Sequence, residues 1–581
     1  MKQPNSLTIR IGGEAGMGLE SSGAGFSKAL TRGGLYVFGL PDYYSRIRGG
    51  HNFFSVRVSR DPLYSHAEPV HLLLALDLES VRRHVDAIVP GGGIVYDEEE
   101  EIPDELRRDE IQFFPVQLTK LAEEKGGHSV MRNTLALGVA AGLIDFDLGH
   151  IESVIRDNFA VKGQKVIDAN LRVAQAGLEA SQPYRDDYPF KMEAVDDAPS
   201  RLVLNGNQAF SIGAMAGGCR FVSAYPMTPG SGVLHWFAAH ADAYGAVTKH
   251  AEDEIAAINM AIGAAHAGAR SMVATSGGGF SLMVEGLGLA GITETPVVIY
   301  NAQRPGPATG LPTRSEQGDL LFMLHASQGE FPRFVLAPGT IEESFDIGWQ
   351  AFNLSERYQT PAMVMSDHYL AVAYRTVEKA ALAFDAVSID RGALLTRDDL
   401  DNLEAPYKRY ELTPSGISPR ALPGHPNAVW VSSSNEHDDT GAISEDAGNR
   451  VAQVDKRTRK MKGAVDEAPA PMHYGPDEAT VTLLCWGSTC GPLREAVDRL
   501  NIEKPGSANM VHFNTMEPFP AHVAETVLDQ AKKTVIVEGN ATGQLETLLR
   551  AHTARSVDGH IHRYDGRAFT PATIIDRLRE V

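Results

Sequence analysis

The chain has 581 residues, a hydrophobic fraction of 43% and a formal net charge of −21. This length predicts about three to four domains of ordinary size. The negative charge argues against a nucleic-acid-binding protein, and no apolar run approaches the roughly 20 residues of a membrane span.

The N-terminus enters a predicted strand with no apolar leader before it, so we expect a cytoplasmic protein. The three cysteines, Cys219, Cys485 and Cys490, form no CxxC motif. Because an iron–sulfur cluster ordinarily needs four cysteine ligands, we expect no cluster in this chain and no metal site of its own. Free thiols without a disulfide framework also suit a reducing compartment.

Residues 1–182 alternate predicted strands and helices, which indicates an α/β domain. Its first turn, GGEAGMG (12–18), departs from the GxGxxG pattern and is followed by no ribose-binding acid, so a dinucleotide is disfavoured. An anionic ligand at this helix start remains an alternative. Residues 183–200 are rich in proline and charge and predict a linker.

Residues 201–385 predict a second α/β domain, residues 386–475 a loop-rich arm and residues 476–581 a third α/β domain. The predicted strands of the second domain are FVSAY (221–225), SMVAT (271–275), PVVIYNA (296–302), RFVLA (333–337) and PAMVMSD (361–367). The fold class is therefore α/β, with three α/β domains.

The most informative stretch, residues 252–283, places acids before a small-residue helix, a short strand and the glycine turn SGGG. A carboxyl removed from water is disfavoured in its charged form. A thiamine diphosphate enzyme needs such an acid to protonate the cofactor's aminopyrimidine N1′. An ordinary acidic first turn of a helix explains the same pattern and stays open at this point.

Further motifs make the pattern more specific, and they occur from one end of the chain to the other. They are GGEAGMGLESSG (12–23), SRIRGGHN (45–52), YPMTPGS (225–231), EDEIAAINMAIGAA (252–265), QRPGPATGLPT (303–313), EHDDTGAISED (436–446) and VEGNATGQL (537–545). With these motifs the chain resembles the alpha subunit of 2-oxoacid:ferredoxin oxidoreductases, with a gamma domain fused ahead of it. The 2-oxoglutarate subgroup is the most similar. The resemblance implies a pyrimidine-binding-type doubly wound sheet in the central domain and a transketolase C-terminal-like last domain.

The resemblance also implies roles for individual residues. Glu254, rather than its neighbour Glu252, takes the position that faces N1′ and is the implied catalytic acid. Tyr225 and Pro226 shape a turn beside the cofactor. Thr228 in the same turn reaches the 2-oxoacid or the cofactor with its hydroxyl.

Cations are expected where the substrate carboxylates bind, because the guanidinium fork of arginine matches a carboxylate. Arg304 is the first candidate for the carboxylate next to the ketone, and Arg314 is the second. Arg46, Arg48 and His51 lie in SRIRGGHN and would serve a distal carboxylate or the CoA phosphates. A solvated basic loop is an equally good interpretation of these three residues.

No GDG motif for a magnesium–diphosphate site occurs in the chain. The resemblance assigns Mg²⁺ and a [4Fe–4S] cluster to a separate beta subunit, with thiamine diphosphate shared between the two chains and CoA as co-substrate. It implies a dimer of alpha–beta heterodimers that oxidatively decarboxylates 2-oxoglutarate to succinyl-CoA and reduces ferredoxin. Pyruvate, branched-chain or aryl 2-oxoacids are alternative substrates, and a non-catalytic scaffold that binds a partner enzyme is an alternative of another class.

Overall fold

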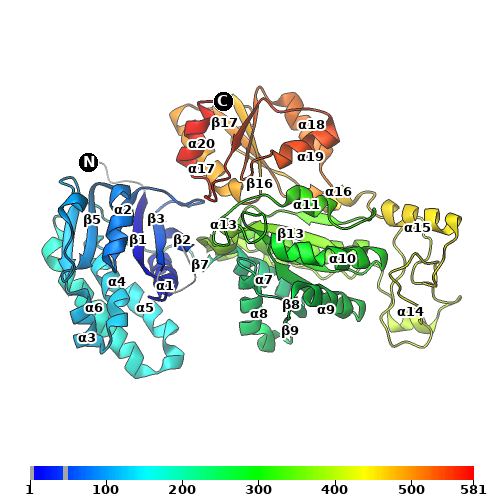
Figure 1. The fold of residues 1–581 in the computed structure, drawn as a ribbon, viewed down its shortest axis with the longest axis horizontal. Helices are drawn as coiled ribbons and strands as arrows, with labels where there is room; N and C mark the ends of the chain where they lie inside the picture. Colours follow the sequence, from blue (N-terminus) through cyan, green and yellow to red (C-terminus); the bar gives the residue numbers. More distant parts are fainter. Residues whose placement is uncertain (1–5, 44–49) are drawn as a thin grey trace. The chain divides into compact units, whose positions relative to one another are not determined.

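The computed structural model describes residues 6–43 and 50–581, which divide into two compact units (Figure 1). The first unit comprises residues 1–205 and 373–381, and the second comprises residues 206–372 and 382–581. The predicted α/β class is confirmed, since each unit is built from sheets covered by helices. Among the described helices, none is long and apolar enough to cross a membrane.

The first unit contains an eight-stranded mixed sheet in the order β6-β5-β4-β1-β3-β2-β14-β7. Strands β1, β4, β5 and β6 run parallel, whereas β3 lies antiparallel between β1 and β2. The strands are β1 (Ser6–Glu14), β2 (Tyr36–Tyr43), β3 (His51–Ser59), β4 (Val70–Ala75), β5 (Ile88–Asp97), β6 (Gln112–Val116), β7 (Arg201–Leu204) and β14 (Tyr374–Glu378). The helices are α1 (Leu19–Arg32), α2 (Leu78–His84), α3 (Leu118–Gly126), α4 (Arg132–Leu143), α5 (Leu148–Asn158) and α6 (Gln164–Arg185).

The edge of this sheet differs from the predicted domain boundaries. Strand β14 pairs antiparallel with both β2 and β7, so residues 201–205 and 373–381 belong to the first unit rather than to the central domain. The predicted linker also begins inside α6, which continues through Pro183. The reason is long-range strand pairing, which leaves no local signal in the sequence. Arg375 of β14 pairs with Leu204 of β7 and with Phe38 of β2.

The second unit is centred on a seven-stranded sheet in the order β18-β12-β13-β11-β10-β8-β9, parallel except for β18. Its strands are β8 (Phe221–Ala224), β9 (Val247–His250), β10 (Ser271–Thr275), β11 (Val298–Gln303), β12 (Phe334–Leu336), β13 (Ala362–Asp367) and β18 (Thr515–Glu517). The helices are α7 (Gly206–Ala216), α8 (Ser231–Tyr244), α9 (Glu254–His266), α10 (Gly277–Ile292), α11 (Leu320–His325), α12 (Ile341–Tyr358) and α13 (His368–Val372). In sequence, β9 follows β8 and pairs on one side of it, whereas β10 pairs on the other side. The strand order therefore switches direction at β8. In open α/β sheets, ligands bind at such a switch point, beyond the carboxyl ends of the strands.

The C-terminal sheet of the second unit has the order β15-β17-β16-β19-β20, parallel except for β15. The strands are β15 (Met472–Tyr474), β16 (Val481–Trp486), β17 (Ala508–Phe513), β19 (Thr534–Glu538) and β20 (Gly559–His562), and the helices are α17 (Cys490–Glu503), α18 (Ala521–Gln530), α19 (Gln544–Thr553) and α20 (Pro571–Leu578). One hydrophobic cluster joins this sheet to the central one, with Trp486, Phe513 and Ile536 packed in the same core as Ile299 and Met363. The two sheets therefore share a core.

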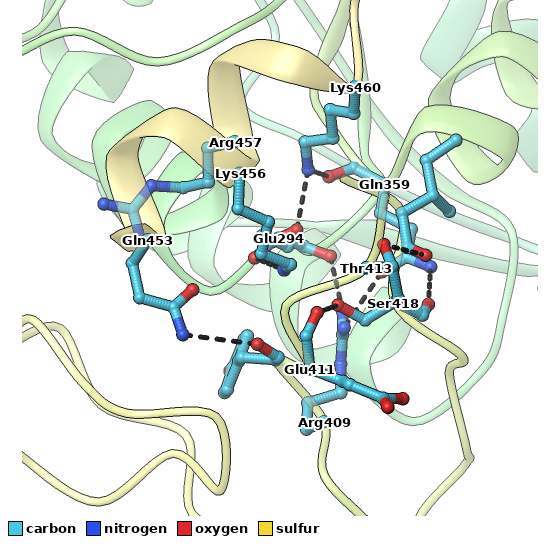
Figure 2. Close-up of polar contacts among 12 residues, drawn as sticks. Glu294, Gln359, Arg409, Glu411, Thr413, Ser418, Gln453, Lys456, Arg457 and Lys460 are labelled. Atoms are coloured by element: carbon cyan, nitrogen blue, oxygen red, sulfur yellow. Dashed lines mark hydrogen bonds and ion pairs between the residues drawn. The ribbon is translucent and has the colours of Figure 1, made fainter. Parts of the chain in front are cut away.

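The arm, residues 386–475, contains the short helices α14 (Arg397–Asp401) and α16 (Ala464–Glu467) and the longer helix α15 (Ala447–Arg459). Buried ion pairs attach it to the central domain. Lys456 Nζ and Lys460 Nζ lie 2.5 and 2.8 Å from the two carboxylate oxygens of Glu294 (Figure 2). Arg420 makes a third buried pair, 2.8 Å from Glu356. In each pair the arm supplies the cation and the central domain the carboxylate.

Candidate active site

The loops that follow β8, β10 and β11 meet at the switch point of the central sheet. The loop after β8 is the turn YPMTPG (225–230), which packs directly on the end of β10. A Cβ atom on Gly230 would lie 2.3 Å from the carbonyl oxygen of Thr275, so only glycine allows this approach. The turn therefore lies directly beside the N-terminus of α10.

Glu254 occupies the first residue of α9 and is 3% exposed, whereas its neighbours Glu252 and Asp253 are exposed. Asp253 caps the helix, since its Oδ1 accepts a hydrogen bond of 2.7 Å from the backbone N–H of Ala256. Within the described part of the chain, Glu254 Oε1 has no hydrogen-bond partner. A buried carboxyl oxygen without a partner is costly and suits a site where a ligand supplies the missing hydrogen bond.

Three glycines at the start of α10, at positions 277–279, form a floor beside this turn, which we call the glycine floor. A Cβ atom on Gly279 would lie 2.1 Å from Thr275 Oγ1 and 2.7 Å from Glu254 Oε1. A Cβ atom on Gly277 would lie 2.4 Å from Asp319 Oδ2, whereas one on Gly278 would meet its nearest atom only at 3.7 Å. Because these glycines carry no side chains, the carboxyl groups of Glu254 and Asp319 can approach the start of α10. Open space remains beside Gly278.

Arg304 connects the loop after β11 to the turn after β8. Its Nη1 donates a hydrogen bond of 2.8 Å to the backbone oxygen of Thr228. Burial lowers the pKa of Arg304 and the charge of Asp319 opposes that shift. The structure therefore brings Thr228 and Arg304 together on the rim of the glycine floor.

Comparisons with known proteins show which family the chain belongs to. Residues 212–456 match the family described as pyruvate flavodoxin/ferredoxin oxidoreductase, thiamine diP-bdg, and residues 8–180 match pyruvate ferredoxin/flavodoxin oxidoreductase. A 2-oxoacid:ferredoxin oxidoreductase subunit alpha from Sulfolobus sp is 32% identical over 99% of this chain and 97% of its own length. The chain belongs to the alpha subunits of the 2-oxoacid:ferredoxin oxidoreductases. The predicted family is confirmed, and the scaffold alternative gives way to an enzyme subunit.

Two further relatives are informative. The 2-oxoglutarate oxidoreductase subunit KorA of Mycobacterium tuberculosis is 27% identical over 94% of this chain and 87% of its own length. A solved 2-oxoglutarate:ferredoxin oxidoreductase from Magnetococcus marinus, with 2-oxoglutarate, coenzyme A and succinyl-CoA bound, covers both chains completely at 33% identity and a TM-score of 0.91.

The residues of this alpha subunit fit thiamine diphosphate at the position of the glycine floor. The unpartnered Glu254 Oε1 would face the aminopyrimidine, and the open space beside Gly278 would admit a flat ring. Ser276 Oγ, at the N-terminus of α10, is a second buried atom without a partner in the described structure. Of the predicted turn residues, Tyr225 is 39% exposed and Pro226 lines an open cleft of about 520 Å³ together with His235 and His250.

The remaining predicted site residues of the oxidoreductase are placed as follows. Arg314 is half-buried and packs beside Gly566 of the C-terminal domain. His51 is buried in the first unit, where its Nε2 lies 2.8 Å from His84 Nε2. Arg46 and Arg48 lie outside the described residues.

The sequence analysis did not single out Asp319, because Leu320 follows it and no GDG motif results. Asp319 Oδ2 accepts a hydrogen bond of 3.1 Å from Asn301 Nδ2. Burial raises the pKa of this carboxyl, while the hydrogen bond from Asn301 and the charge of Arg304 oppose the shift. The available signal was its position directly before α11, after a strand of the central sheet.

Proposed function

We propose that this alpha subunit serves in the oxidative decarboxylation of 2-oxoglutarate with CoA, which yields succinyl-CoA, CO₂ and reduced ferredoxin. The observation that supports this substrate is the likeness, over the whole length of both chains, to the Magnetococcus marinus enzyme with these ligands bound. The KorA relative of Mycobacterium tuberculosis points to the same substrate. Pyruvate, branched-chain and aryl 2-oxoacids remain alternatives, because the Sulfolobus relative is named only for 2-oxoacids.

Glu254 has the central role in the proposed site. When bound, thiamine diphosphate would supply a nucleophilic carbon that adds to the ketone carbon, and a cationic ring that takes up the electron pair released as CO₂ leaves. Glu254 Oε1 would hold the proton that it shares with the aminopyrimidine N1′. Its burial keeps water from competing for that proton, and the glycine floor orients the ring.

Arg304 and Thr228 are proposed to hold the carboxylate next to the ketone. One N–H of Arg304 is engaged by the Thr228 carbonyl, and a guanidinium carries five N–H donors, so others remain for a carboxylate. The hydrogen bond to Thr228 also fixes the guanidinium before substrate arrives, which lowers the ordering cost of binding. Arg314 stays the second candidate for this role.

The other parts of the reaction are proposed to come from a beta subunit. That chain would hold Mg²⁺ with the diphosphate and the [4Fe–4S] cluster, with a dimer of alpha–beta heterodimers as the assembly and ferredoxin as the acceptor. For the distal carboxylate we propose Arg46, Arg48 and His51, with the CoA phosphates as the alternative ligand of the same residues. A charged carboxylate left unpaired in a closed site would be costly, so some cation must meet it.

Co-expression with the beta chain and an assay of CoA-dependent viologen reduction across a panel of 2-oxoacids tests the proposal. We expect kcat/KM for 2-oxoglutarate to exceed that for pyruvate, and Arg46→Ala or Arg48→Ala to narrow the difference by about 10-fold or more. Arg60→Ala, which changes an exposed arginine of the same domain, is the matched control. A preference for pyruvate in the intact complex would overturn the substrate assignment.

A further inference from the structure

The loop between β11 and α11, residues 304–319, carries Arg304, and the C-terminal domain binds its last residues. Gln317 makes three of these contacts. Its backbone N–H donates to Gly539 O at 2.7 Å, its Oε1 accepts from Gly539 N at 2.7 Å, and its Nε2 donates to Trp486 O at 2.8 Å. Both the backbone and the side chain of Gln317 are therefore held by the neighbouring domain.

Two further side chains of the C-terminal domain bind this segment, and one of them reaches the start of α11. Gln544 Nε2 donates to Gly318 O at 2.8 Å, and Gln544 Oε1 accepts from the backbone N–H of Leu321 at 3.0 Å. Asn540 Nδ2 donates to Gln317 O at 3.1 Å. Six hydrogen bonds thus join residues 317–321 to Trp486 and to residues 538–544, and we refer to Trp486 together with residues 538–544 as the C-terminal clamp.

The clamp is itself rigid, because a buried carboxyl ties its parts together. Glu538 is fully buried, and its Oε2 accepts hydrogen bonds from Trp486 Nε1 at 3.2 Å, Asn540 Nδ2 at 2.6 Å and Leu545 N at 3.1 Å. Glycine at position 487 leaves room for Gln317, since a Cβ there would lie 2.7 Å from Gln317 Nε2. The clamp therefore fixes Gln317 in one position.

Asp319, in the middle of the clamped segment, reaches the glycine floor. The backbone N–H of Asp319 donates to Gln303 Oε1 at 3.0 Å, and Asp319 Oδ2 lies against Gly277 at the N-terminus of α10. Between Arg304 and Gln317, by contrast, residues 306–311 are exposed and gain little from burial. The loop is therefore held by Thr228 at its first end and, beyond its exposed part, by contacts of Ser315 and by the clamp. Ser315 Oγ donates to Asp367 Oδ1 at 3.2 Å, and the backbone N–H of Ser315 donates to Gly566 O at 3.2 Å.

We propose that Gln317 and Gln544 are positioning residues for the 2-oxoacid, so that the C-terminal domain sets the substrate site of the central domain through the clamp. Adhesion of the two domains does not require these hydrogen bonds, because both sheets already share a hydrophobic core. The inference rests on the proposed function, since the substrate is assigned there to Arg304 and Thr228.

The test compares Gln317→Ala and Gln544→Ala in the complete alpha–beta complex with Asn501→Ala. Asn501 of α17 makes similar amide hydrogen bonds, to Ala508 O at 2.7 Å and from Ser507 N at 3.0 Å, but does not reach the loop. We expect the two clamp variants to raise KM for the 2-oxoacid about 10-fold, the effect of losing two hydrogen bonds, with kcat within about twofold. Asn501→Ala should leave KM unchanged.

A measurement without substrate separates this inference from the proposed function. In the full chain alone, we expect backbone amides of residues 305–319 to exchange hydrogen about 10-fold faster in Gln317→Ala, with no change in α9. A complex that turns over no 2-oxoacid contradicts the proposed function, whatever the exchange rates. An active complex in which the clamp variants leave KM unchanged, or unchanged exchange in residues 305–319, overturns the positioning role.

Discussion

At the scale of single residues, Glu254 is distinguished from the acids beside it by burial. We expect Glu254→Gln to reduce turnover of the complex by about 10²–10⁴-fold, because an amide cannot exchange a proton with the aminopyrimidine. The fold should persist, since glutamine has nearly the same shape. Steady-state kinetics of the reconstituted complex and the thermal midpoint of each variant measure the two effects. Glu252→Gln, at an exposed position, should leave turnover almost unchanged. An equal loss of turnover in both variants would show that Glu254 is the wrong carboxyl.

How far the site could be predicted depends on where each partner lies in the sequence. Glu254 and Thr228 stand in local patterns, a helix start and a proline turn, so sequence alone could propose them. Gln317 could not be found in this way, because its partners Trp486 and Gly539 are more than 160 residues away. Sequence reasoning recovers residues that are defined by their neighbours in the chain and misses those that are defined by contacts between domains.

At the scale of elements, the attachment of the arm depends on Glu294. Replacing it by glutamine would leave Lys456 and Lys460 buried without a countercharge, and breaking a buried pair in this way typically costs about 3–5 kcal/mol. We expect Glu294→Gln to loosen α15 and to expose the arm to limited proteolysis, whereas Glu285→Gln, at an exposed position on α10, should not. Identical proteolysis patterns for both variants would mean that the ion pairs do not hold the arm.

The pairing of strands β1 and β4 contains a group that responds to acid. The backbone N–H of Thr8 donates to His71 Nδ1 at 3.0 Å, which requires a neutral ring, and burial lowers the pKa of His71 to about 4. Because the unfolded ring has a pKa near 6.5, the unfolded chain binds more protons between these values. Stability is therefore present above about pH 6.5 and is lost as the pH falls toward 4.

For a shift of this size the loss is at most about 3 kcal/mol. Amide hydrogen exchange of β1 at pH 7 and pH 5 measures it, because exchange reports on one element of a multidomain chain. His71→Asn keeps an acceptor near Nδ1 and does not titrate, so its exchange, corrected for the intrinsic rate, should depend less on pH. If exchange in β1 depends on pH equally in the wild-type protein and in His71→Asn, His71 is not the source of the acid sensitivity.

The sequence predicted which segments form strands better than it predicted which strands pair with one another. The predicted strands of the central domain all form, because their apolar runs are buried on both faces of a parallel sheet. The segments of β7 and β14 were not predicted as strands and were placed in the central domain, since pairing of an edge strand depends on which segment reaches it in space. The ion pairs of the arm were also invisible in sequence, where lysines on a charged helix such as α15 predict a solvated face.

At the scale of the whole molecule, the chain on its own is expected to be inactive and to bind no iron. Cys219, Cys485 and Cys490 are all buried, and an iron–sulfur cluster ordinarily needs four ligands. Absorbance near 400 nm and iron analysis of the purified single chain test the expectation. Stoichiometric iron in that preparation would contradict it, and activity should return only with the partner chain.

The strand order of the first sheet constrains how the protein is made. Strand β2 becomes an interior strand only when β14 arrives, and β14 follows β3 by more than 300 residues. At about 5–20 residues per second, translation leaves this edge uncovered for roughly 15–60 s on the ribosome. An unpaired edge is a template for association with other chains. We therefore expect a chain ending at residue 200 to self-associate in sedimentation experiments, and the nascent protein to depend on chaperones during this interval.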